Sequence, residues 1–205
     1  MAAILARKLG MTQVFGEDGA VARVTVLEAG PCHVTAIRTS ERDGYDAVQL
    51  AFGAVREKAL SKPELGHLAK ADAPPLRHLV EFRDEGDGLA VGETVSVAVF
   101  EPGQRVKVSG TSKGKGFQGT VKRHRFHRGP VTHGSHNTRA PGSIGASATP
   151  SRVVKGIRGP GQMGNKRVTQ RGLEVVEVRA GENLLFVRGA VPGPRNGYVE
   201  VRSDG

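Results

Sequence analysis

The sequence predicts a mainly β protein, in which a small closed or partly open β-barrel body carries a long irregular basic extension and a small, partly helical insertion. Three observations support this class. Short segments alternate apolar and polar residues, turn-forming residues separate them, and one long stretch shows neither the strand period nor the helix period. Short strands joined by turns favour a barrel over a parallel sheet, since no regular alternation of strands with helices is present.

Six segments of the body are predicted to be strands, because β-branched and other apolar residues recur along them at strand spacing. Turn signals rich in Gly, Pro, Asp or Asn separate several of them, and 180–183 has the composition of a hairpin turn between the fourth and fifth segments. In chain order the predicted strands are 21–27, 47–52, 94–100, 173–179, 184–188 and 198–201.

An insertion is predicted near residues 55–90. The stretch Ser61-Lys-Pro-Glu64 resembles a helix start, with Ser61 as the cap and Pro63 early in the first turn, so a short helix should begin here. The acidic, glycine-containing stretch 81–92 is expected to be a loop.

Charge is divided very unevenly along the chain. No acidic residue lies between Glu101 and Glu174, and the basic segment 102–173 contains 15 Lys or Arg, 14 Gly and four His. The rest of the chain contains 15 Lys or Arg and 20 Asp or Glu, so a segment of +15 and a remainder of −5 give the net charge of +10. Such one-sided basic patterning is typical of proteins that bind a phosphate backbone.

The basic segment is too long and too rich in Gly and Pro to be an ordinary loop of a compact domain. Alone in water it cannot bury enough apolar surface to offset the entropy lost on ordering. A flexible linker and an arm that folds on nucleic acid are the two alternatives. The second is favoured by apolar residues scattered through the segment, namely Phe117, Phe126, Ile144, Val153, Val154, Ile157 and Met163.

A phosphate-binding loop of the P-loop type is excluded by spacing. The pair Gly114-Lys115 comes four positions after Gly110 rather than five, and Gly116 stands where Ser or Thr is required. The small residues and the charges of Lys113 and Lys115 still suit phosphate, which points to a nucleic-acid backbone.

Two His-x-x-His pairs, His124 with His127 and His133 with His136, raise the possibility of a metal site. Neighbouring cations disfavour a metal ion, and no nearby carboxylate can orient an imidazole, so contact with RNA is the favoured role. For the same reason Ser135 has no acidic partner for a catalytic triad. We therefore expect no metal, no cofactor, no small-molecule substrate and no enzymatic activity.

The single cysteine, Cys32, cannot form an internal disulfide and is expected to be a small buried residue. No run of about 18 apolar residues is present, and the N-terminal apolar run is too short for a signal peptide. These features predict a cytoplasmic protein that does not enter a membrane.

The stretch Gly110–Arg123 (GTSKGKGFQGTVKR) resembles the signature of the universal large-subunit ribosomal protein L-three family, in its bacterial form. The resemblance continues, in order and over essentially the whole chain, through 8–15, 132–135, 139–145, 149–150, 155–156, 161–164 and 183–193. It implies a barrel body on the solvent side of the large ribosomal subunit and an extension that passes through 23S-type rRNA toward the peptidyl transferase centre. It also implies early binding during subunit assembly, near the 3′ end of that rRNA, beside the ribosomal proteins L-fourteen and L-nineteen.

The chain departs from the family pattern at four places. Lys107 stands where an acidic residue is common, and His124 stands where many members have Trp. Ala146 occupies the position of a Gln that is methylated in some relatives, so that modification should be absent here. Pro160 and Gly161 replace a common Met-Ala pair.

Together these features predict a structural rRNA-binding protein, with a body at 1–103 and 168–205 and an extension at 104–167. A free-standing RNA-binding regulatory or chaperone module and a nucleic-acid-processing enzyme with a basic channel are the alternatives. The tip predicted to approach the peptidyl transferase centre is Gly142, Ser143, Ile144, Gly145 and Ala146. The predicted rRNA-binding residues are Lys107, Lys113, Lys115, Lys122, Arg123, His124, Arg125, Arg128, His133, His136, Arg139, Arg152, Lys155, Arg158, Lys166 and Arg167.

Overall fold

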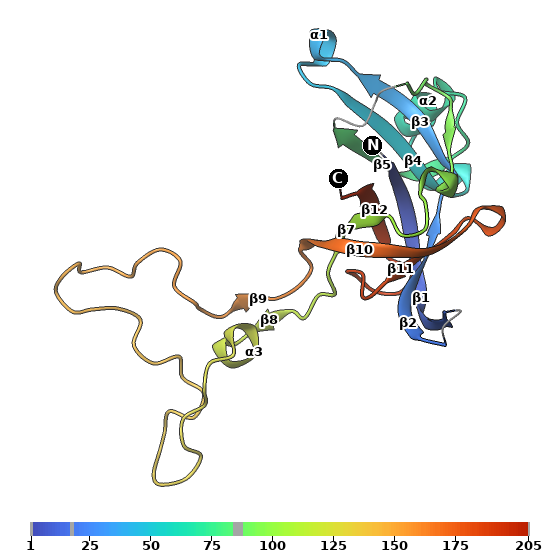
Figure 1. Cartoon of the computed structure of the whole chain (residues 1–205). Helices are drawn as coiled ribbons and strands as arrows, with labels where there is room; N and C mark the ends of the chain where they lie inside the picture. The colour runs from blue at the N-terminus through green and yellow to red at the C-terminus, as the bar shows by residue number, and fades with distance from the viewer. Residues whose placement is uncertain (1, 17–18, 84–87, 205) are drawn as a thin grey trace. The chain divides into compact units, whose positions relative to one another are not determined.

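The computed structural model describes residues 2–16, 19–83 and 88–204 (Figure 1). The chain divides into two compact units, which we call the barrel unit (Met1–Ser112 with Arg167–Gly205) and the basic unit (Lys113–Lys166). The barrel unit holds a closed barrel and a four-stranded sheet, and the basic unit holds a two-stranded sheet. Strands are the main elements of the barrel unit, whereas the described chain between β8 and β9 is largely irregular, as the sequence predicts.

Six strands close the barrel in the order β1-β12-β7-β10-β11-β2, and every neighbouring pair is antiparallel. This confirms the predicted barrel. Because the barrel is closed, each of its six strands pairs with a neighbour on both sides. The strands are β1 (Ala3–Phe15), β2 (Val21–Ala29), β7 (Arg105–Thr111), β10 (Arg167–Arg179), β11 (Leu184–Arg188) and β12 (Tyr198–Ser203).

The barrel interior is filled by alternate residues of its strands, which is the reason for the period of two in the sequence. Ile4 of β1 pairs with Val201 of β12, which pairs with Val108 of β7, and all three side chains are fully buried. Gly110 lies close to its cross-strand partner on β12: a Cβ there would lie 2.9 Å from Cγ1 of Val199, so a larger residue would force this pair apart.

The four-stranded sheet has the order β5-β4-β3-β6, and its strands are also antiparallel. One face contributes Val48, Leu50 and Phe82 to the same buried cluster as the barrel residues. On the other face Ala51 packs with Leu68 of the helix α2. The strands are β3 (Cys32–Arg38), β4 (Ala47–Ala54), β5 (Leu76–Arg83) and β6 (Thr94–Val95).

The predicted helix of the insertion is present as α2 (Lys62–Ala69). Ser61 and Glu64 form a capping box at its N-terminus. The Glu64 carboxylate accepts hydrogen bonds from Ser61 N at 2.7 Å and Ser61 Oγ at 2.8 Å. These two bonds hold the pKa of Glu64 below its usual value. The remaining short helices of the barrel unit are α1 (Ser40–Asp43), η1 (Glu57–Ala59), η2 (Val97–Val99) and η3 (Ala180–Glu182).

Two predictions about local structure are wrong. Residues 94–100 are not one strand, because β6 ends at Val95 and Ser96 Oγ accepts a hydrogen bond from Ala98 N at 3.4 Å, which starts η2. The region 55–90 is not merely a surface insertion, because β5 pairs with β4 along its length. Part of the loop expected at 81–92 is thus strand, and its residues 84–87 lie outside the described residues.

The extension was expected to begin at residue 104, whereas β7 remains in the barrel to Thr111 and β10 re-enters it at Arg167. Val106 and Val108 explain this difference, since both are fully buried in the barrel interior. Across the described residues, no helix combines the length and the apolar character that crossing a membrane requires.

Candidate nucleic-acid interface

The basic unit is held together at its base, where its two ends meet. The strands β8 (Phe117–Gln118) and β9 (Gly161–Gln162) pair antiparallel. Next to them Lys115 N donates to Met163 O at 2.9 Å, and Met163 N donates to Gly116 O at 3.0 Å. The approach requires glycine at Gly164, where φ is +69° and a Cβ would lie 2.0 Å from the Lys113 carbonyl oxygen.

The helix α3 (Thr120–His124) adds side-chain contacts to this base. Arg123 Nη1 donates to the Gly159 carbonyl oxygen at 2.7 Å, and His124 Nε2 lies 3.0 Å from the same oxygen. The helix ends at Arg125, which adopts a left-handed conformation with φ of 59°. Arg123 and His124 therefore take part in holding the returning chain, in addition to any contact with RNA.

Beyond this base the chain makes few internal contacts. Gly129 N donates to Thr138 O at 3.0 Å, which closes a smaller loop. All side chains at 139–158 are exposed. The described hydrogen bonds within 139–158 are local ones between Ser143 and Gly145. The predicted tip, 142–146, lies in this exposed stretch, so nothing inside the unit holds it.

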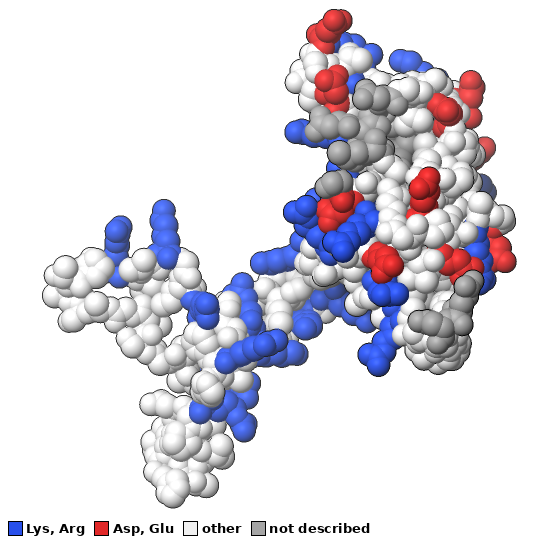
Figure 2. All heavy atoms as spheres, viewed as in Figure 1, with Lys and Arg blue, Asp and Glu red and all other residues white. Residues whose placement is uncertain are grey.

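The basic unit contains no carboxylate, so its cations have no counterion within the unit. Figure 2 shows Lys and Arg but no Asp or Glu atoms along this segment. Large apolar side chains are exposed there as well, between 48% for Val153 and 76% for Phe117. The exposed cations of the predicted set are Lys113, Lys115, Lys122, Arg125, Arg128, Arg139, Arg152, Lys155, Arg158 and Lys166.

Two further predicted cations, Lys107 and Arg167, belong to the barrel unit. Arg167 forms an ion pair with Glu200 at 2.5 Å, and Lys107 stands opposite Arg202 in the pairing of β7 with β12. Arg171 of β10 and Arg202 of β12, the two strands that flank β7, were absent from the predicted set. Only the barrel register brings these two residues close to Lys107.

The structure does not gather three of the four histidines of the two His-x-x-His pairs into one site. His127, His133 and His136 are exposed, and His124 contacts the Gly159 carbonyl and lies 6.1 Å from Phe126 between ring centroids. Across the described residues, no group of three or more His, Cys, Asp or Glu is placed to hold a metal ion.

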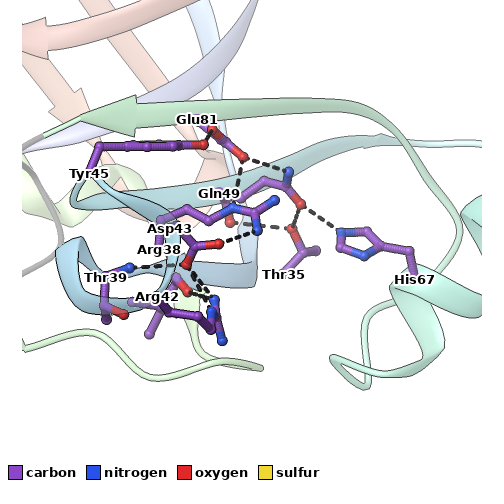
Figure 3. Close-up of polar contacts among 10 residues, drawn as sticks. Thr35, Arg38, Thr39, Arg42, Asp43, Tyr45, Gln49, His67 and Glu81 are labelled. Carbon is purple, nitrogen blue, oxygen red and sulfur yellow. Dashed lines mark hydrogen bonds and ion pairs between the residues drawn. The ribbon is translucent and has the colours of Figure 1, made fainter.

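A second polar cluster lies on the face of the four-stranded sheet that carries α2 (Figure 3). Glu81 accepts hydrogen bonds from Tyr45 Oη at 2.8 Å and Arg38 Nε at 3.3 Å, and these partners keep its pKa low. Gln49 Oε1 accepts from Thr35 Oγ1 at 2.8 Å and lies 2.7 Å from His67 Nε2. The side chains of this cluster satisfy one another's hydrogen-bonding groups and connect three strands with α2. We therefore interpret the cluster as structural.

Cys32 lies buried at the start of β3, where its Sγ is 3.5 Å from the Leu5 carbonyl oxygen. Burial raises the pKa of this thiol to about 12. The thiolate that nucleophilic chemistry needs is therefore suppressed at neutral pH.

Comparison with known proteins identifies the family of the chain. The family model described as "Ribosomal protein L3" matches residues 80–184. A protein of Synechococcus elongatus named "Large ribosomal subunit protein uL3" is 56% identical over 97% of this chain and 93% of its own length. Proteins of the same name from Synechococcus sp. (strain CC9311) and Thermosynechococcus vestitus are 50% and 51% identical over 97% of this chain, and over 92% and 94% of their own lengths. A match of this extent leads to one conclusion: the chain belongs to the ribosomal protein L3 family.

Proposed function

We propose that the basic unit binds large-subunit rRNA directly and that this binding supports assembly of the subunit. As a member of the ribosomal protein L3 family, the chain is a structural component of the large ribosomal subunit and not an enzyme. Its place of action is the cytoplasm, where bacterial large subunits lie.

One observation carries the proposal: the basic unit exposes its cations and its apolar side chains together, and it contains no carboxylate. Lys and Arg neutralise phosphates and release their counterions, which supplies most of the affinity. Exposed apolar groups such as Phe117 and Val154 gain contacts only when a partner covers them. The chain between β8 and β9 loses conformational entropy when it becomes ordered. These contacts with RNA then offset that loss.

The tip is proposed to occupy the position that the family resemblance implies. Small residues dominate at 142–146, and Arg139 is the only cation between Arg128 and Arg152. Low bulk and low charge suit close approach to packed RNA, so we propose that the flanks supply affinity and that the tip reaches toward the peptidyl transferase centre. The ribosomal proteins L-fourteen and L-nineteen are the proposed protein neighbours.

Chemical probing of large-subunit rRNA, with and without the full chain, tests this function. We expect discrete protected sites that are lost when Lys113 and Lys115 are both changed to Glu. An identical reactivity profile in the presence and absence of the protein would contradict direct binding. Stoichiometric association with large subunits after a high-salt wash separates the ribosomal role from that of a free-standing RNA-binding module.

A further inference from the structure

Arg123 differs from every other cation of the basic unit in its surroundings. The structure describes this unit throughout, and of its 11 Lys and Arg residues ten are exposed, whereas Arg123 alone is half-buried. Arg123 is therefore the cation of the unit with the least surface open to a phosphate.

The Arg123 guanidinium lies against two glycines of the returning chain. Its Nη1 donates a hydrogen bond to the Gly159 carbonyl oxygen at 2.7 Å. A Cβ at Gly161 would lie 2.8 Å from Nη1, 3.3 Å from Cζ and 3.6 Å from Nη2, so the guanidinium takes the space that a side chain at Gly161 would need. One side of the group is thus covered by the protein itself.

His124 reaches the same carbonyl group. Its Nε2 lies 3.0 Å from the Gly159 oxygen. A carbonyl oxygen only accepts and has two lone pairs, so it can take a hydrogen bond from both side chains when Nε2 of His124 carries the proton. Two consecutive residues at the end of α3 therefore converge on one backbone atom of the returning chain.

These side-chain contacts begin where the backbone pairing ends. The last pair of β8 and β9 is Gln118 with Gly161, and the returning chain has Pro160 immediately before that pair. Proline has no N–H and cannot extend a strand ladder. The outgoing chain turns into α3 at this point. Through Arg123 the helix thus supplies a cross-chain bond that the backbone can no longer make.

We propose that Arg123 is a positioning residue for RNA binding: it clamps the base of the basic unit before RNA arrives and makes no phosphate contact of its own. His124 assists it on the same carbonyl oxygen. The inference rests on the proposed function, because the clamp serves the binding of rRNA by the basic unit. It removes Arg123 from the phosphate contacts that the sequence predicts.

Such a clamp raises affinity because it lowers the entropy that RNA binding must overcome. Arg123 and Gly159 are 36 positions apart, and closing a loop of this length costs conformational entropy. With the base already closed in the free protein, RNA has to order only the chain beyond it. A base that is closed for only part of the time reduces the apparent affinity by the closed fraction.

Direct contact of Arg123 with phosphate is the competing role, and the dependence of binding on salt separates the two. A cation that neutralises a phosphate releases counterions, so its loss lowers the slope of log K against log salt by about 1. Loss of a clamp lowers the affinity at every salt concentration and leaves the slope unchanged.

The first test measures binding of the full chain to transcribed large-subunit rRNA over a range of salt concentrations. Arg123→Gln should bind about 3- to 10-fold more weakly than the parent, with the parental slope. The matched control is Lys122→Gln, which removes an exposed cation from the same helix and should lower the slope by about 1. A lowered slope for Arg123→Gln, or an affinity equal to that of the parent, would overturn the inference.

The variant Lys113→Gln with Lys115→Gln tests the proposed function in the same assay. Its slope should fall by about 2, because two exposed cations are lost. Parental affinity and slope for this double variant would contradict the proposed function. A reduced slope here, together with parental binding by Arg123→Gln, would contradict the clamp alone.

A cross-link that replaces the clamp provides a second test. Phe117 of β8 stands opposite Gln162 of β9, and opposed residues of an antiparallel pair lie at a Cα separation that suits a disulfide. In the triple variant Phe117→Cys, Gln162→Cys and Arg123→Gln, oxidation should restore most of the lost affinity, and reduction should remove the gain. Cys32 does not compete for the new thiols, because it is buried and its pKa is raised to about 12.

The same cysteine pair with Arg123 retained is the control for loss of the Phe117 side chain. Its affinity should change little on oxidation, because the base is already closed. Mass spectrometry verifies the disulfide in both proteins. An oxidised triple variant that binds no better than its reduced form would show that RNA needs the guanidinium itself, and the clamp would be overturned.

Hydrogen exchange in the free protein gives a readout that does not involve RNA. Met163 N donates to Gly116 O at 3.0 Å, so its exchange rate reports opening of the base. Arg123→Gln should raise this rate, whereas amides of the barrel strands should exchange as in the parent. An unchanged rate at Met163 would show that Arg123 does not hold the base closed.

Discussion

Arg123 and Gly159 are 36 positions apart in the chain, yet Arg123 Nη1 donates a hydrogen bond to the Gly159 carbonyl oxygen at 2.7 Å. A Cβ at Gly161 would lie 2.8 Å from the same nitrogen, so a larger residue there would displace the Arg123 guanidinium from this contact. Together with the pairing of β8 and β9, it holds the outgoing and returning chain of the basic unit side by side. The chain between them has few such bonds, one of them from Gly129 N to Thr138 O at 3.0 Å, so we expect it to be less ordered than the base in the free protein.

Limited proteolysis of the free protein should therefore be graded along the basic unit. We expect proteinase K to cut first within 129–158, where backbone hydrogen bonds are few, and more slowly at the base and in the barrel unit. Arg123→Leu should speed cleavage at the base while leaving the barrel unit resistant. Mapping the fragments by mass spectrometry checks this, and equal resistance from 113 to 166 would contradict it.

Changing Lys113 and Lys115 to Glu should weaken rRNA binding and lower the salt slope by about 2, because two phosphate contacts become repulsive. Filter binding at several salt concentrations measures both quantities. The control is Lys58→Glu with Lys62→Glu, which reverses two exposed charges of the barrel unit. If the two double variants lose affinity equally, the effect is one of net charge and not of this loop.

Ala146→Trp should leave the unfolding midpoint of the free protein unchanged, because the side chains around Ala146 are exposed and belong to neither buried core cluster. A bulky group at the tip should instead disturb subunit maturation or sensitivity to antibiotics that bind the peptidyl transferase centre. Sucrose-gradient profiles and inhibitor titrations measure these effects. Variant ribosomes that assemble and respond as the parent does would place the tip elsewhere.

Gly53→Ala should destabilise the barrel unit by about 1–3 kcal/mol. Gly53 has φ of +84°, and a Cβ there would lie 3.2 Å from Tyr198 Oη and 3.4 Å from His78 Cδ2. Gly66→Ala is the control, because a Cβ at this position in α2 meets nothing within 4 Å. It should stabilise by about 0.5–1 kcal/mol, since Ala favours the helix. Urea unfolding of both variants checks the opposite signs.

Stability should fall at alkaline pH in a way that depends on Cys32. Its pKa is about 12 in the folded chain, compared with about 8.5 in an unfolded one. Between these values the unfolded state releases a proton that the folded state keeps, so rising pH favours unfolding. Urea unfolding at pH 7.5 and pH 10 should show a smaller loss for Cys32→Ala than for the parent. Equal losses would show that the thiol does not titrate in this way.

The sequence predicted correctly those elements that depend on residues close together in the chain. The strand at 184–188 and the start of α2 at Ser61 were found because alternation and capping depend on residues close in sequence. β1 and β3 were missed: the bulge at Lys8 and Gly10 interrupts the alternation of β1, and a similar shift interrupts β3 between Val34 and Ala36. β5 was missed because the helix α2 separates it in sequence from β4, the strand with which it pairs.

The sequence by itself determined the charge division, the cations and glycines available to the basic unit, and the barrel class, because all of these follow from composition and short-range period. Only the tertiary structure decided that β7 belongs to the barrel and that Arg171 and Arg202 lie close to Lys107. It also decided that Arg123 faces Gly159. Strand register, and the path by which the basic unit returns to β10, depend on burial and on hydrogen bonds between residues far apart in sequence. A local sequence pattern contains no information about such contacts.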